Sequence, residues 1–168
     1  MKRRVVAGAI AALLLTTPAY AEWVSFSDPA GAFTIELPVK PTAKSDTTVT
    51  KTGSSIPLTE YVIDFDSIEL VVMVADYSSS TEKLDIEGGV RALASDGRVL
   101  KSEKTIHLDG RDGRFARLTD KAGNEYTDQV FIIGRRLYQA ITVLPAKAGD
   151  AQRAEIERFN ASFHFTAR

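Results

Sequence analysis

Carboxylates spaced along one strand-like segment are the first residues whose types and spacing could do chemistry. Asp64 and Asp66 stand two residues apart, and Glu60 shares their parity. Paired carboxylates of this kind serve in general acid–base catalysis, as in hydrolases, and they also bind calcium. The opposite parity carries an apolar set, Tyr61, Ile63 and Phe65. Such alternation is typical of any strand with one solvated face, and the sequence pattern of a calcium-binding loop is absent. A carboxylate-dependent hydrolase is therefore kept only as a second alternative.

Histidine and serine offer little further chemistry. His107 and His164 are the two histidines of the sequence, and neither stands in a two-ligand spacing or beside a cysteine. His164 lies between Phe163 and Phe165, so its side chain is expected to point away from theirs. No serine has the Gly-x-Ser-x-Gly context of a strand-to-helix nucleophile. The sequence therefore predicts no catalytic residue, no metal site and no cofactor.

Arginines and tyrosines are candidates for binding. Five arginines lie close to predicted turns: Arg111, Arg114, Arg117, Arg135 and Arg136. They form an anion-binding patch if the ends of the hairpins converge, and otherwise they serve solubility. Four tyrosines could line a groove: Tyr61, Tyr77, Tyr126 and Tyr138. Strands favour tyrosine for packing alone, so none is assigned as a ligand contact.

The beginning of the chain predicts export. Three basic residues, Lys2, Arg3 and Arg4, precede an apolar run over residues 5–15, and Ala19 and Ala21 then frame a small-x-small site. This pattern is typical of a secretory signal peptide, and the run is about half the length of a membrane-spanning helix. We expect cleavage after Ala21, a mature chain of residues 22–168, no stable membrane anchor, and a location in a bacterial periplasm or a secreted pool.

Composition narrows the classes of partner. The chain has 21 Lys and Arg residues against 22 Asp and Glu, and removing the three basic residues of the signal peptide leaves 18 against 22, a net charge of −4. A general affinity for nucleic acid or anionic lipid is therefore disfavoured. The sequence contains no cysteine, which excludes disulfides and acylation at the cleavage site. The length of the mature chain predicts a single domain with one hydrophobic core.

Short strands dominate the pattern along the chain. Residues 24–27 and 33–37 predict a first hairpin, residues 44–52 a polar strand near a sheet edge, and residues 58–66 a half-buried strand. Residues 70–75 and 130–133 are apolar at both parities, which predicts cover on both faces. Four strands form a predicted meander, at 99–108, 113–119, 125–133 and 136–144, with turn residues such as Asp109 and Gly110 between them.

Two helices are expected to supply the cover. The first spans about residues 81–96, with Ser80 or Thr81 as the cap and Gly97 in the left-handed position after its end. Gly88 and Gly89 inside it indicate either a later start or a close backbone approach. The second spans about residues 150–160 with Asp150 as the cap, and residues 163–165 form a closing strand. The fold class is therefore α+β, a sandwich with a central antiparallel sheet of about six to nine strands and helices packed on both faces; a barrel with helical lids is the alternative.

Residues over nearly all of the mature chain carry a family resemblance. They comprise the motif Gly-x-Phe-Thr-Ile-x-Leu-Pro at residues 31–38, and also Trp23, Pro41, Leu137, Tyr138, Phe159, Ser162 and Phe163. In their order they resemble a secreted PsbP-like domain. The resemblance implies an antiparallel sheet with helices on both sides and a non-catalytic accessory or protein-binding role. Such domains include subunits that support photosystem II and relatives that bind a small GTPase, and no residue set for either partner is reproduced here.

These observations favour an exported, non-enzymatic module of the cell envelope that binds an unknown protein partner. An exposed apolar patch would support this hypothesis. The alternative is a small-ligand carrier, which requires a lidded pocket of about 300 Å³ or more lined by Tyr and Phe. The second alternative is a periplasmic hydrolase that uses Asp64 and Asp66.

Overall fold

The computed structural model describes residues 22–166 with the exception of residues 31, 51 and 96, so the predicted signal peptide over residues 1–21 lies outside the described residues. The described part forms ten strands and two helices. In chain order they are β1 (Val24–Ser27), β2 (Phe33–Leu37), β3 (Thr42–Val49), β4 (Ser55–Phe65), β5 (Ile68–Asp76), α1 (Ile86–Ala94), β6 (Val99–Leu108), β7 (Arg111–Thr119), β8 (Glu125–Ile133), β9 (Arg136–Leu144), α2 (Asp150–Ser162) and β10 (His164–Phe165). No helix in this part is long and apolar enough to cross a membrane.

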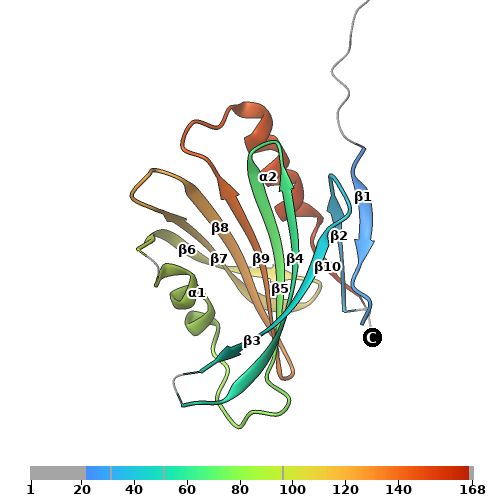
Figure 1. Cartoon of the computed structure of the whole chain (residues 1–168), viewed down its shortest axis with the longest axis vertical. Helices are drawn as coiled ribbons and strands as arrows, with labels where there is room; N and C mark the ends of the chain where they lie inside the picture. The colour runs from blue at the N-terminus through green and yellow to red at the C-terminus, as the bar shows by residue number, and fades with distance from the viewer. Residues whose placement is uncertain (1–21, 31, 51, 96, 167–168) are drawn as a thin grey trace, which may run out of the picture.

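The strands form two antiparallel sheets (Figure 1). The large sheet has seven strands in the order β3-β4-β5-β9-β8-β7-β6, which confirms the α+β class with a central antiparallel sheet. Its described strands end at two separate edges, β3 and β6, so the barrel alternative is wrong. A smaller sheet of order β1-β2-β10 lies beside α2, and the sequence does not predict that the first hairpin and the closing strand pair with each other.

Tight turns set the register of the hairpins. Asp109 and Gly110 both have positive φ, 51° and 74°, as a two-residue turn between twisted antiparallel strands requires. Asp66 and Ser67 do the same between β4 and β5, with φ of 46° and 66°. The predicted strand over 58–66 therefore ends at Phe65, because Asp66 already belongs to the turn.

The core consists of two apolar clusters that meet at the large sheet. One contains α2 residues Ile156 and Phe159 together with Phe131, and the other contains Val90 of α1 together with Val130. Val130 and Phe131 are consecutive residues of β8, so their side chains point to opposite faces of the strand. This arrangement explains why the sequence over residues 130–133 is apolar at both parities. Val130 and Phe131 are each 0% exposed, so each face of the strand is covered at this point.

The first helix is shorter than predicted. It begins at Ile86, and the cap is Asp85, whose carboxylate accepts a hydrogen bond from the Gly88 amide, so the expected caps Ser80 and Thr81 are wrong. Residues 77–82 form a loop instead, because the Arg135 guanidinium donates to the carbonyl oxygens of Tyr77, Ser80 and Glu82. The expected left-handed residue after the helix is confirmed, since Gly97 has a φ of +78°.

Gly89 is the point of closest approach between α1 and the sheet. A Cβ atom on Gly89 would lie 2.9 Å from Cγ1 of Val130. The glycine pair is thus explained by a close approach as well as by the late start. In α2 the N-cap is Gly149 rather than Asp150, and the Gln152 side chain accepts from the Gly149 amide at 2.7 Å.

Candidate functional site

The predicted carboxylate pair does not share a strand face, although Asp64, Asp66 and Glu69 line one open groove of about 430 Å³. Asp64 lies near the end of β4 opposite Glu69 of β5, whereas Asp66 occupies the turn that follows. The Asp66 carbonyl oxygen accepts a hydrogen bond from Nε2 of Gln152 at 3.1 Å, which ties the turn to α2. Among the described residues no group of three His, Cys, Asp or Glu side chains is placed to hold a metal ion. The pairing of Asp64 and Asp66 on one strand face was therefore wrong, because the turn begins between them.

Each histidine contacts a carboxylate, and each contact joins two strands or a strand and a turn. His107 of β6 contacts its cross-strand partner Asp112 on β7. Nδ1 of His164 lies 3.3 Å from Oδ2 of Asp109, and the same oxygen accepts a hydrogen bond from the Phe165 amide at 2.8 Å. Asp109 therefore fastens β10 to the β6–β7 turn. His164 is exposed, as its position between two buried phenylalanines predicts.

The five arginines separate into two groups. Arg114 pairs with Glu103 at 3.3 Å, and the Arg117 guanidinium lies 5.5 Å from the centre of the Phe115 ring. The other three, Arg111, Arg135 and Arg136, line one cleft of about 300 Å³. The hairpin ends thus converge for part of the predicted patch only.

The four tyrosines also divide. Tyr61 and Tyr138 line a pocket of about 270 Å³ beside Asp28, while Tyr77 and Tyr126 pack against the cluster that contains α1. The Tyr61 hydroxyl donates to Oδ1 of Asp28 at 2.9 Å. Burial, and then the hydrogen bond to Asp28, raise the pKa of Tyr61 to about 12. The Tyr61 hydroxyl is therefore neutral at neutral pH and joins the β1–β2 loop to the large sheet.

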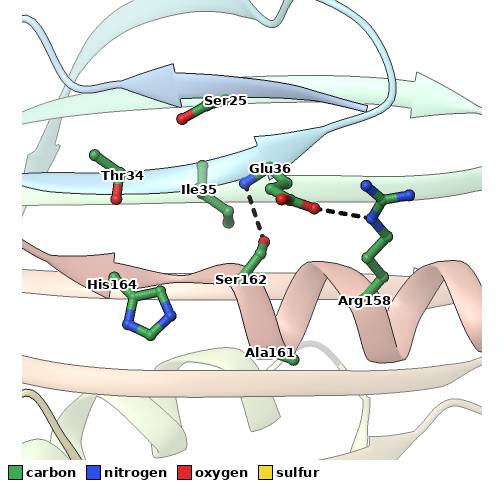
Figure 2. Close-up of a pocket in the computed structure, with 8 residues that line it drawn as sticks. All are labelled: Ser25, Thr34, Ile35, Glu36, Arg158, Ala161, Ser162 and His164. Carbon is green, nitrogen blue, oxygen red and sulfur yellow. Dashed lines mark hydrogen bonds and ion pairs between the residues drawn. The ribbon is translucent and has the colours of Figure 1, made fainter. Parts of the chain in front are cut away.

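A polar groove of about 430 Å³ lies between β2 and the end of α2 (Figure 2). The Arg158 Nε donates to Oε2 of Glu36 at 2.9 Å, and Ser162 Oγ accepts from the Glu36 amide at 3.0 Å. Figure 2 shows both contacts joining the helix to the strand. These groups hold α2 against the small sheet, and the groove lacks the Tyr and Phe lining that a ligand carrier requires.

An apolar surface on the large sheet is the strongest binding candidate. Val62, Val71 and Ile141 are cross-strand partners in one row over β4, β5 and β9, and Met73 and Val143 follow two residues along the same face. Side chains two residues apart point to one face, so these five residues form a continuous surface that we name the open face. Val71 is 9% exposed and the other four are more exposed still.

The first helix is too short to cover this surface. The nine residues of α1 extend about 14 Å, whereas a nine-residue strand extends about 30 Å. The helix packs mainly on β7 and β8. On β4 and β5 its cluster reaches Ile56 and Ala75, which lie at one end of these strands. Beyond that end, Val62, Met73 and Val143 remain partly exposed. Three acidic residues border the open face on β4 and β5: Glu60, Asp64 and Glu69.

Asp128 is a functional candidate that the sequence reading missed. Its side chain is 0% exposed, and its Cα partner on β9 is Ile141 of the open face. Gln139 Nε2 donates to Oδ2 at 2.8 Å, while Oδ1 has no hydrogen-bond partner among the described residues. Burial raises the pKa of Asp128 to about 7, against the lowering effect of the Gln139 hydrogen bond. The sequence does contain a signal for this burial. Asp128 alternates with Tyr126 and Val130 along the strand, so the pattern places it on the same face as these two side chains.

Comparisons with known proteins support the fold alone. No family model matches the chain, and no curated protein matches it. The solution structure of cyanobacterial PsbP (CyanoP) from Synechocystis sp. PCC 6803 is similar, with a TM-score of 0.55 over 95% of this chain and 98% of that chain. The two sequences are 14% identical. The resemblance to a PsbP-like fold is thereby confirmed.

Proposed function

We propose that this PsbP-like fold is an exported, non-enzymatic accessory module of the cell envelope that binds another protein through the open face. The observation that carries the proposal is an apolar row of Val62, Val71 and Ile141 at the centre of a folded sheet, in which Val62 and Ile141 remain partly exposed. Exposed apolar surface costs free energy in water, and a contiguous patch of it marks interaction sites on soluble proteins.

The remaining candidate groups support binding over catalysis. The side chains of both histidines and of the Glu36–Arg158 pair are engaged in contacts within the chain that hold elements together. Burial of Val62, Met73 and Val143 by a partner would remove apolar surface from water at about 25 cal/mol per Å². The two helices belong to different core clusters, and we infer that they cover opposite faces of the sheet. Because α1 covers its face only in part, the remainder of that face provides the docking surface.

The proposed location follows from the basic and apolar residues that begin the chain. Cleavage after Ala21 would release residues 22–168 into the periplasm or a secreted pool. The partner would then be a protein of the envelope. An intact mass that begins at Glu22 in the exported fraction tests this part, and recovery of the uncleaved chain would contradict it.

A photo-crosslinking experiment tests the binding surface. A photoreactive amino acid is placed in turn at Val62, Met73 and Val143 on the open face. The control position is Lys104, which is exposed on β6 and pairs with Phe115 on the other face. We expect irradiation of intact cells to yield one major crosslinked protein from position 143 and none from position 104. Identical products from both positions, or no product from positions 62, 73 and 143, would contradict the proposal.

A further inference from the structure

A cleft lined by three arginines lies away from the open face. Arg111 begins β7, Arg135 stands in the β8–β9 turn, and Arg136 begins β9. Together with Ile133, Tyr138 and others they enclose about 300 Å³. We name this site the arginine cleft.

Strand register explains why distant arginines meet there. On β8, Phe131 is the partner of Gly113, and continuing this register places Arg111 opposite Ile133. Ile133 is in turn the partner of Arg136 on β9, and Arg136 is the partner of Asp76 on β5. Adjacent strands lie about 4.8 Å apart, so the two arginines flank the isoleucine at about 10 Å between backbones. Their long side chains can reach one group bound above Ile133.

The three guanidinium groups differ in how far they are already engaged. Arg135 bonds to three loop carbonyl oxygens, so its role at the cleft is mainly its charge. Arg111 donates from Nη1 to the Asp109 carbonyl oxygen at 3.0 Å, and its guanidinium carbon lies 5.0 Å from the centre of the Phe165 ring. Arg136 Nε donates to Oδ2 of Asp76 at 2.9 Å. A guanidinium has five N–H donors, so Arg111 and Arg136 both keep donors for a ligand.

The charge of the cleft is positive in a chain of opposite sign. Three guanidinium groups line it, and one carboxylate, Asp76, pairs with Arg136. Arginine forks match the two oxygens of a carboxylate or phosphate group and bind them bidentately. Next to these donors stand the apolar side chain of Ile133 and the ring of Tyr138.

We propose that the arginine cleft binds a small organic oxyanion, with its phosphate or carboxylate oxygens on Arg111 and Arg136 and its apolar part against Ile133 and Tyr138. The cleft volume stands at the lower end of the range for small-ligand sites, which limits the ligand to a compact molecule. This inference is independent of the open face, because the two surfaces share no residue.

Titration with defined probes tests the inference. Amide shifts of the purified protein are followed at constant ionic strength with phenyl phosphate, benzoate and inorganic phosphate. We expect saturable shifts at Ala32, Ser78 and Gly134, all of which line the cleft. Stronger binding of phenyl phosphate than of benzoate would identify a phosphate ligand, and the reverse a carboxylate. Inorganic phosphate should bind more weakly than phenyl phosphate, because it has no apolar part to contact Ile133 and Tyr138. Shifts that do not saturate, or that spread over the surface, would overturn the inference.

Variants with opposite expected effects complete the test. Arg111→Gln removes charge-assisted hydrogen bonds and should weaken binding about tenfold. Asp76→Asn keeps an acceptor for the Ser78 amide but frees Arg136, so it should tighten binding several-fold. Arg117→Gln, on the same strand as Arg111 but outside the cleft, should change nothing. Equal affinities for the three variants would overturn the inference.

Discussion

Asp128 is the residue whose environment is least favourable to its charge. It lies fully buried among apolar neighbours in β7, β8 and β9, with one carboxylate oxygen satisfied by Gln139 and the other not. A buried acceptor without a partner costs free energy, and an ionised one costs more. Because the pKa rises from 3.8 to about 7, the native state takes up a proton that the unfolded chain does not hold at the same pH. The free energy of unfolding should therefore fall as the pH rises from about 4 to about 7, and stay level above that.

Replacing Asp128 by asparagine should remove this pH dependence. The shift of about three pKa units corresponds to about 4 kcal/mol, an upper limit for the gain in unfolding free energy of Asp128→Asn at pH 8. The measurement is urea unfolding between pH 4 and pH 8. Asp64→Asn, which replaces an exposed carboxylate, is the control and should keep the wild-type profile. Parallel profiles for wild type and Asp128→Asn would show that Asp128 does not titrate in this range.

The first helix is the element whose position depends on one glycine. Gly89 faces Val130, which is 0% exposed, and a Cβ atom on Gly89 would lie 2.9 Å from its Cγ1. The loop before the helix is held at both ends, by the Arg135 guanidinium and by Thr50 and Thr52, which donate to the Glu82 carboxylate. These contacts set α1 close to one end of the sheet and so leave the open face beyond it.

Gly89→Ala should therefore destabilise the protein in spite of alanine's better helix propensity. The propensity gain is about 1 kcal/mol, and the contact of 2.9 Å with Val130 should cost about 1–3 kcal/mol. A double-mutant cycle with Val130→Ala measures the coupling, and the loss from Gly89→Ala should shrink when Val130 is truncated. Ala92→Gly, at an exposed position of the same helix, is the control, because it changes helix propensity alone and its effect should not depend on Val130. Additive effects at Gly89 and Val130 would contradict the close approach.

At the scale of the whole molecule, the two faces of the large sheet are unequally protected. One face carries the larger cluster, with Phe33, Phe131 and Phe163 fully buried between the sheet, α2 and the small sheet. The other carries the smaller cluster, which includes Val90 of α1, at one end and the open face at the other. The open face, where apolar side chains remain partly exposed, therefore contributes little to the stability of the protein on its own.

Matched substitutions on neighbouring strands test that asymmetry. Val62→Thr on the open face should lower the unfolding free energy by less than about 1 kcal/mol, whereas Val72→Thr, at a position 0% exposed on the other face, should lower it by about 1–3 kcal/mol. Valine and threonine have nearly the same shape, so the difference reports how far water already reaches each site. Equal losses in urea unfolding would mean that the open face is as well covered as the core.

The sequence by itself determined the features that depend on neighbours along the chain. Alternation around Tyr61 and Ile63 predicted a half-buried strand, the apolar run 130–133 a strand covered on both faces, and Asp109 and Gly110 a tight turn. Side-chain period and backbone φ are local properties, so they can be read from a few consecutive residues.

Only the tertiary structure decided which distant residues meet. The pairing of β2 with β10, the loop over 77–82 held by Arg135, and the convergence of Arg111 on Arg136 all join segments far apart in the chain. The burial of Asp128 and the exposure of Val62 likewise depend on where a nine-residue helix ends above the sheet. Packing of the whole molecule sets which strands pair, in which register, and how much of a sheet a helix covers. A pattern over a few consecutive residues therefore cannot predict these features.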